Sequence, residues 1–202
     1  MTSTLTTTDI DKIRGYITNH HLVTGLGTRD KPCSIAAINL ALTGALTDEI
    51  PGCMSGVIGG WVIQIQDHMP DTIRNSTEWK HALINAAGTG RNPDDEKTRL
   101  DIILEHMWTV TLPIIQPVAD AHGFGVEWAT MCLERTATAT YAASASASAA
   151  AAYDAARAAD YATDAATNAA FYAAYAAYAA TAGAWDQINP AGLLQQLVAV
   201  GE

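Results

Sequence analysis

Val126–Ala184 reads VEWATMCLERTATATYAASASASAAAAYDAARAADYATDAATNAAFYAAYAAYAATAGA, and this stretch decides the fold. It contains no proline, and its single glycine is Gly183. Alanine is the strongest helix former, because it loses no side-chain entropy and does not compete for backbone hydrogen bonds. At a rise of 1.5 Å per residue the stretch predicts a rod of roughly 85 Å, or else a helical hairpin. The serines within Tyr141–Ser148 mark the expected fold-back point, since their hydroxyls offer local hydrogen bonds.

The aromatic side chains in the later half of this stretch fall on one side of the predicted helix, and alanine covers the other side. Small side chains allow a second helix to approach closely. The aromatic side is either a half-buried packing surface with solvated hydroxyls or a recognition face for a partner. The residues expected on this interaction face are Tyr153, Arg157, Tyr161, Tyr172, Tyr175 and Tyr178.

Composition limits the class of protein. The formal net charge is −10 at pH 7 over 202 residues, and no block of basic residues occurs. This charge argues against a nonspecific nucleic-acid binder. Met1–Thr8 has neither a charged segment nor an apolar segment, so it does not resemble a signal peptide. The alanine-rich stretch is too weakly apolar for a membrane span, and we expect a soluble cytoplasmic protein.

The part before the alanine-rich stretch predicts a bundle of helices with large apolar core residues. Thr8 with Asp11 approximates a capping box for a first helix, and Pro32 suits the first positions of a second. The apolar segment Cys53–Met69 predicts a central helix, with a strand over Trp61–Gln66 as the alternative.

Several further signals mark helix ends in the rest of the chain. Asn75 with Glu78 resembles a capping box, and Asn92-Pro93 followed by three acids is a strong helix start. Pro113 and Pro117 are expected to kink or divide the helix that follows. Asn189-Pro190 opens a short closing helix. The predicted organisation is a helical core domain over residues 1–125, an alanine-rich long helix or hairpin over 126–188, and the closing helix over 189–202.

One glycine-bearing loop could hold an anion. Gly25 and Gly27 would allow backbone N–H groups to approach a ligand, and Arg29 and Lys31 add positive charge beside a helix N-terminus. The loop matches neither a P-loop nor a dinucleotide fingerprint, so an ordinary surface turn is the alternative. The expected ligand-binding residues, taken with the other sparse cations, are Gly25, Gly27, Arg29, Lys31, Arg74 and Arg91.

Cys33 is the alternative reactive group. A helix N-terminus lowers a cysteine pKa, and a histidine such as His68 could serve as the base. The competing interpretation is a small buried residue. The three cysteines have no spacing typical of a zinc site or a redox motif, so no metal and no cofactor are expected.

Five further features of the sequence occur together: Gly25-Leu26-Gly27-Thr28, Lys31-Pro32-Cys33, Ile50-Pro51-Gly52-Cys53, the Trp61–Asn75 segment and the alanine-rich tail. In this combination the chain resembles an uncharacterised family of alanine-rich hypothetical proteins from bacteriophages and some bacteria. The resemblance covers most of the chain and implies a phage or phage-like origin, which would place the protein in the host cytoplasm. The family has no established activity, so no functional residue follows from it.

The sequence therefore predicts an all-α protein that forms a homo-oligomer, because so long an alanine face has little partner surface within one chain. The leading functional hypothesis is a non-enzymatic binding or assembly protein. It would act on a host partner or sequester a small anionic, nucleotide-like ligand. The alternatives are a cysteine-dependent hydrolase or transferase using Cys33 with a histidine, and a structural phage component.

Overall fold

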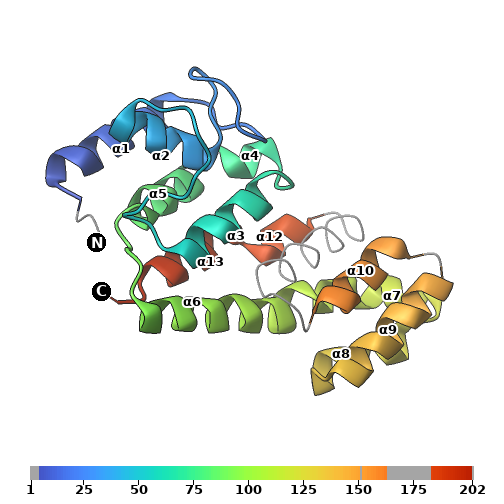
Figure 1. The fold of residues 1–202 in the computed structure, drawn as a ribbon. Helices are drawn as coiled ribbons and strands as arrows, with labels where there is room; N and C mark the ends of the chain where they lie inside the picture. The colour runs from blue at the N-terminus through green and yellow to red at the C-terminus, as the bar shows by residue number, and fades with distance from the viewer. Residues whose placement is uncertain (1–4, 151, 163–182, 202) are drawn as a thin grey trace. The chain divides into compact units, whose positions relative to one another are not determined.

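The computed structural model describes residues 5–150, 152–162 and 183–201 (Figure 1). Across these residues the secondary structure is helical, with one isolated bridge between Gly27 and Pro32 and no strand. The all-α prediction is confirmed. The chain divides into two compact units, Met1–Arg99 with Pro190–Glu202, and Leu100–Asn189. The domain boundaries predicted at residues 125 and 188 follow the alanine content of the sequence and not the packing of the helices. They stay a prediction.

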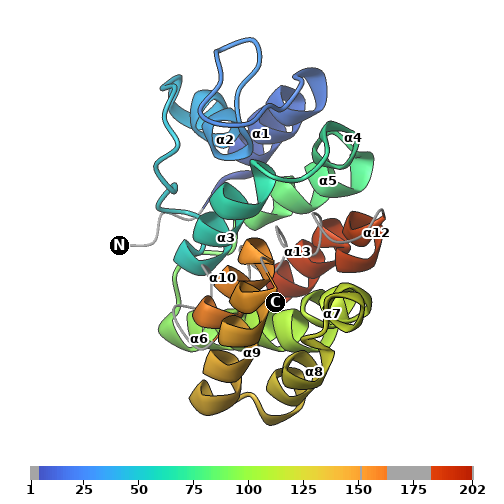
Figure 2. The same ribbon diagram turned by 90° about the vertical axis from the view of Figure 1, so that its right-hand side faces the viewer.

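The first unit is built on the helices α1 to α5 together with the C-terminal helix α13. In Figure 2, α5 lies between α1 and α13, and it packs against both. Their buried faces share a core that includes Ile13, Ile17, Leu83, Leu194 and Leu197. The helix bounds are α1 Thr7–Asn19, α2 Ser34–Thr43, α3 Gly56–Gln66, α4 Asp71–Arg74, α5 Thr77–Ala86, the start of α6 Pro93–His106, and α13 Pro190–Val198.

The cap of α1 differs from the sequence prediction. The capping box of α1 uses Thr6 and Asp9, not Thr8 and Asp11. The same threonine-rich segment offers both pairs, each with an acid three residues on, and the helix uses the pair that lies two residues earlier.

The caps of α2 and α5 also differ from the prediction. Cys33 is the N-cap of α2, so Pro32 precedes the helix rather than entering it. Ser76 caps α5 by accepting a hydrogen bond from the Trp79 N–H. Asn75 is not the N-cap because its side chain bonds elsewhere: its Oδ1 accepts from the Leu22 N–H at 2.8 Å and its Nδ2 donates to the Leu22 carbonyl at 3.0 Å.

The apolar segment after Cys53 forms the helix α3, and the strand alternative is wrong. One of the glycines of α3, Gly59, is required by close packing. A Cβ placed on Gly59 would come within 2.8 Å of Cγ1 of Ile50, whereas a Cβ on Gly60 would meet nothing within 4 Å. Gly59 therefore permits the loop at Ile50 to pack tightly against α3.

The second unit begins within α6 and continues through a helix that changes type twice. A π-helical turn, η1 (Met107–Thr111), precedes a 3₁₀ turn, η2 (Pro113–Ile115), and then α7 (Gln116–His122). Pro113 lacks an N–H, and its ring would clash with the carbonyl four residues earlier, so the wider turn relieves the helix there. The interruption expected at these prolines is found at Pro113, where the helix type changes, and Pro117 lies in the first turn of α7.

The predicted rod does not form in the described part of the alanine-rich stretch. It consists of α8 (Gly125–Glu134), α9 (Ala137–Ala149) and α10 (Tyr153–Tyr161), and α9 packs against α10 as a hairpin. Arg135 ends α8 in the left-handed conformation, at φ 55°. The hairpin turns just after Ala149, directly beyond the predicted segment Tyr141–Ser148, and the buried Ala143 and Ala147 of that segment belong to the packing face of α9. The unit closes with α12 (Ala184–Ile188).

One helical stretch, 93–122, is long and apolar enough by composition to cross a membrane, among the residues described. Its best window has a mean hydropathy of 1.2, and 39% of that window is buried within the protein. Ile103, Met107, Leu112 and Ile115 form its buried side. A core helix passes the same criterion, so this is weak evidence for a span.

Candidate functional site

Several backbone N–H groups in and beside the glycine loop already have acceptors within the protein. The Gly25 N–H donates to the Asp67 carboxylate at 2.8 Å, and the Thr28 N–H donates to the Lys31 carbonyl at 2.9 Å. The Cys33 N–H donates to the Leu26 carbonyl at 3.1 Å. The acceptor for the Gly25 N–H is thus a carboxylate of the chain itself, which would repel a second anion.

The three arginines expected to bind an anion hold backbone carbonyls instead. Arg74 is buried and donates to the carbonyls of Gln66 at 2.8 Å and Met69 at 2.6 Å, at the C-terminal end of α3. Arg91 donates to the carbonyls of Met54 and Ile50, and Arg29 donates to that of Gly44 just after α2. Cations at helix C-termini complement the negative end of the dipole. These arginines tie loops and helix ends together.

Cys33 lacks the exposure and the lowered pKa that a nucleophilic cysteine needs. Its side chain is fully buried and its Sγ accepts the Ala36 N–H at 3.4 Å as the N-cap of α2. Burial raises the pKa of the Cys33 thiol, and this outweighs the hydrogen bonds from the helix N-terminus, which lower it. The expectation of a lowered pKa is therefore wrong, because desolvation is the larger effect at this position.

The predicted aromatic face is described only in part. Tyr153 is 69% exposed, and Arg157 is also exposed, while alanines on the other side of α10 are buried against α9. Tyr172, Tyr175 and Tyr178 lie outside the described residues, as does the side chain of Tyr161. The alanine side packs closely as expected, and the recognition role of the aromatic side stays a prediction.

A cavity of about 290 Å³ between α1 and α5 brings together residues that were not predicted as a site. Its lining contains a guanidinium, an ammonium, an imidazole, an amide and two hydroxyls, and no carboxylate. The lining residues are Arg14, Thr18, Asn75, Thr77, Lys80, His81 and Ile84. A cavity lined by donors without a carboxylate is suited to an anion.

Lys80 is the most constrained cation of this cavity. Its Nζ donates to the His20 carbonyl at 2.9 Å, which uses one of its three N–H donors. Burial lowers the pKa of Lys80, because its ammonium has lost part of its hydration. Across the cavity, Arg14 is exposed and forms an ion pair with Asp11 at 2.7 Å. A bound anion would replace the hydration that Lys80 has lost.

Helix geometry explains how the cavity forms. Thr77, Lys80, His81 and Ile84 are spaced by three and four residues, so they share one side of α5. Arg14 and Thr18 are spaced by four and share one side of α1. The spacing was visible in the sequence, but nothing in it indicated that α1 and α5 would be neighbours.

A metal site is not found in the described part of the chain, where no group of three histidine, cysteine, aspartate or glutamate side chains could hold an ion. The acids after Pro93 occupy the first turn of α6. Asp94 and Asp95 donate their N–H groups to Oδ1 of Asn92, and Glu96 accepts from the Val57 N–H at 2.9 Å.

Comparison of the chain with protein-family models, with curated proteins and with solved structures finds no match in any of the three.

Proposed function

We propose that this protein is a non-enzymatic binding protein for a small anionic ligand, which occupies the cavity between α1 and α5. The observation that carries the proposal is the lining itself: Arg14, Lys80 and His81 converge on one cavity without a lining carboxylate, in a chain of net charge −10. The predicted class of ligand is retained, and its site moves from the glycine loop to this cavity.

The partial desolvation of Lys80 supports the proposal. A cation that has lost hydration gains more from an anion than a fully solvated lysine does, because the local dielectric is lower. Thr18 and Thr77 supply neutral hydroxyl donors and acceptors around the charge. The cysteine-dependent alternative has no comparable support, since Cys33 is buried and its pKa is raised.

Isothermal titration calorimetry with pyrophosphate tests the site. We expect Lys80→Met and Arg14→Met each to weaken binding at least about tenfold, the size of effect expected for losing one charge-assisted hydrogen bond. Lys31→Met is the matched control, because Lys31 is exposed on the glycine loop and lies outside the cavity. Binding that depends on Lys31 and not on Lys80 would contradict the proposed site and restore the loop. Circular dichroism shows whether Lys80→Met still folds.

The proposal also retains a homo-oligomer in the cytoplasm. In the described residues, the alanine sides of α9 and α10 pack against each other and so are not open to a second copy of the chain. The support for an oligomer therefore comes from α8. Val126 and Leu133 are 78% and 84% exposed, and their spacing of seven residues places them on one side of that helix. An exposed apolar side of this kind is typical of a surface that binds another protein.

A further inference from the structure

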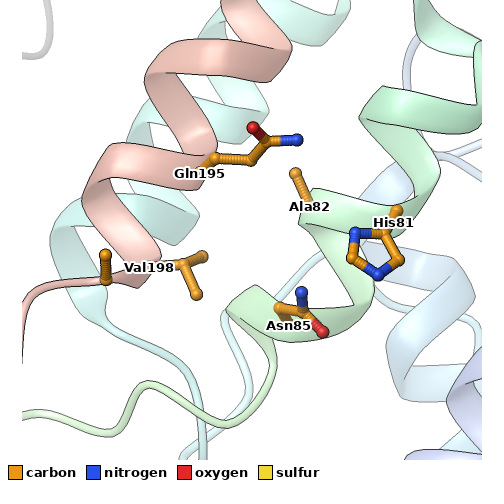
Figure 3. Close-up of a pocket in the computed structure, with 6 residues that line it drawn as sticks. His81, Ala82, Asn85, Gln195 and Val198 are labelled. Carbon is orange, nitrogen blue, oxygen red and sulfur yellow. The ribbon is translucent and has the colours of Figure 1, made fainter. Parts of the chain in front are cut away.

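A second cavity adjoins the cationic one along α5. It has a volume of about 340 Å³ and lies between α5 and α13, as Figure 3 shows. His81, Ala82 and Asn85 come from α5, while Gln195, Val198 and Ala199 come from the C-terminal helix and the residue after it. His81 also lines the first cavity. The two cavities therefore flank the exposed side of one helix and share one side chain.

The chemistry of the second cavity differs from that of the first. No lysine, arginine, aspartate or glutamate is among its lining residues. Asn85 and Gln195 each present one carbonyl oxygen and one NH₂ group, and Ala82, Val198 and Ala199 supply apolar surface. A carboxamide can form a paired donor–acceptor contact with the edge of a nucleobase, as asparagine and glutamine do with adenine. The apolar side chains suit the flat face of such a ring.

We propose that the two cavities together accept a nucleotide, with the phosphate at Arg14 and Lys80 and the base between Asn85 and Gln195. This inference rests on the proposed function, because the phosphate end is the anion site already described. The two volumes together fall within the range of roughly 300–1,000 Å³ that small-molecule sites occupy. His81 lies between the two ends, where its ring would contact the sugar.

The placement of charge selects this ligand class over other anions. A dicarboxylate or a polyphosphate would place a second negative group in the cavity of Asn85 and Gln195, where no lysine or arginine is available to pair with it. An uncharged heterocycle satisfies both amides and covers Val198 at the same time. The two cavities thus match a molecule with one anionic end and one neutral, hydrogen-bonding end.

Calorimetry with inorganic phosphate, ribose 5-phosphate and the four common nucleoside monophosphates tests the inference. We expect at least one nucleotide to bind about tenfold or more tightly than ribose 5-phosphate. Asn85→Leu and Gln195→Leu should remove that advantage and leave ribose 5-phosphate binding unchanged. Gln196→Leu is the matched control, since Gln196 is exposed on the same helix and does not line the cavity.

The outcomes separate this inference from the proposed function. If ribose 5-phosphate and every nucleotide bind equally well, with all binding lost in Lys80→Met, the anion site stands and the base site is wrong. If no phosphate-bearing probe binds, or binding is unaffected by Lys80→Met, both proposals are wrong. A nucleotide advantage that survives the double variant Asn85→Leu/Gln195→Leu would also overturn the base site.

Discussion

Arg99 and Leu197 lie 98 residues apart in the sequence, and Nε of Arg99 donates a 3.0 Å hydrogen bond to the carbonyl oxygen of Leu197. The same guanidinium donates to the Val200 carbonyl at 2.8 Å and forms an ion pair with Glu96 at 3.0 Å. Arg99 is 1% exposed. It therefore joins the start of α6 to the C-terminal end of α13, and so holds one wall of the second cavity in place.

Replacing Arg99 should strongly destabilise the fold. Arg99→Met would remove the donor to the Leu197 and Val200 carbonyls and the ion pair with Glu96. We expect a loss of about 3 kcal/mol in the free energy of unfolding. Urea denaturation followed by circular dichroism measures it. Arg14→Met, which removes an exposed ion pair, should cost less than about 1 kcal/mol. Equal losses in the two variants would show that Arg99 contributes no more than a surface residue.

The Arg99 contact illustrates what the sequence could and could not indicate. The helix start at Asn92-Pro93 and the breaks at Pro113 and Pro117 were predictable, since each depends on a few neighbouring residues. The roles of the arginines were not, because their acceptors are carbonyls on other elements. The cationic cavity was missed for the same reason: its members have helical spacing, but only packing places α1 beside α5.

Two adjacent glycines of α3 should respond in opposite directions to alanine. Gly59→Ala would force a Cβ against the Ile50 side chain, and we expect a loss of about 1–3 kcal/mol. Gly60→Ala meets open space and should stabilise the helix by about 0.5–1 kcal/mol, because alanine has the higher helix propensity. Thermal unfolding compares them directly. A stabilising Gly59→Ala would show that Ile50 moves aside without cost.

Arg135, the residue with positive φ between α8 and α9, allows its alanine and glycine variants to be compared. Arg135 forms an ion pair with Glu105 and lies over the Trp108 ring, with 5.9 Å between Cζ and the ring centroid. Both Arg135→Ala and Arg135→Gly remove these contacts, but glycine adopts positive φ without strain. We expect the glycine variant to be about 1 kcal/mol more stable than the alanine variant in urea denaturation. The reverse order would mean that this backbone conformation changes once the arginine is lost.

His106 should make stability depend on pH. Burial lowers the pKa of His106, although a hydrogen bond with the Ile188 backbone acts in the opposite direction. The unfolded chain then binds a proton near the ordinary value of 6.5 while the folded chain does not. The contribution of the neutral ring is therefore present above pH 6.5 and is lost as the pH falls through the folded-state pKa. Urea denaturation at pH 7.5, 6.5 and 5.5 should show a decrease that His106→Gln reduces. If stability falls with pH as steeply in His106→Gln as in the wild-type chain, groups other than His106 cause the decrease.

The exposed side of α8 predicts how assembly responds to charge. If Val126 and Leu133 contact a second copy of the chain, Leu133→Lys would bury an unpaired ammonium in the interface and dissociate the oligomer. Size-exclusion chromatography with light scattering at micromolar concentration measures the mass of each variant. Leu26→Lys is the control, because it makes the same change at a residue 39% exposed in the other unit. A monomeric wild-type chain would contradict the oligomer outright, and an oligomer that tolerates Leu133→Lys would place the interface away from α8.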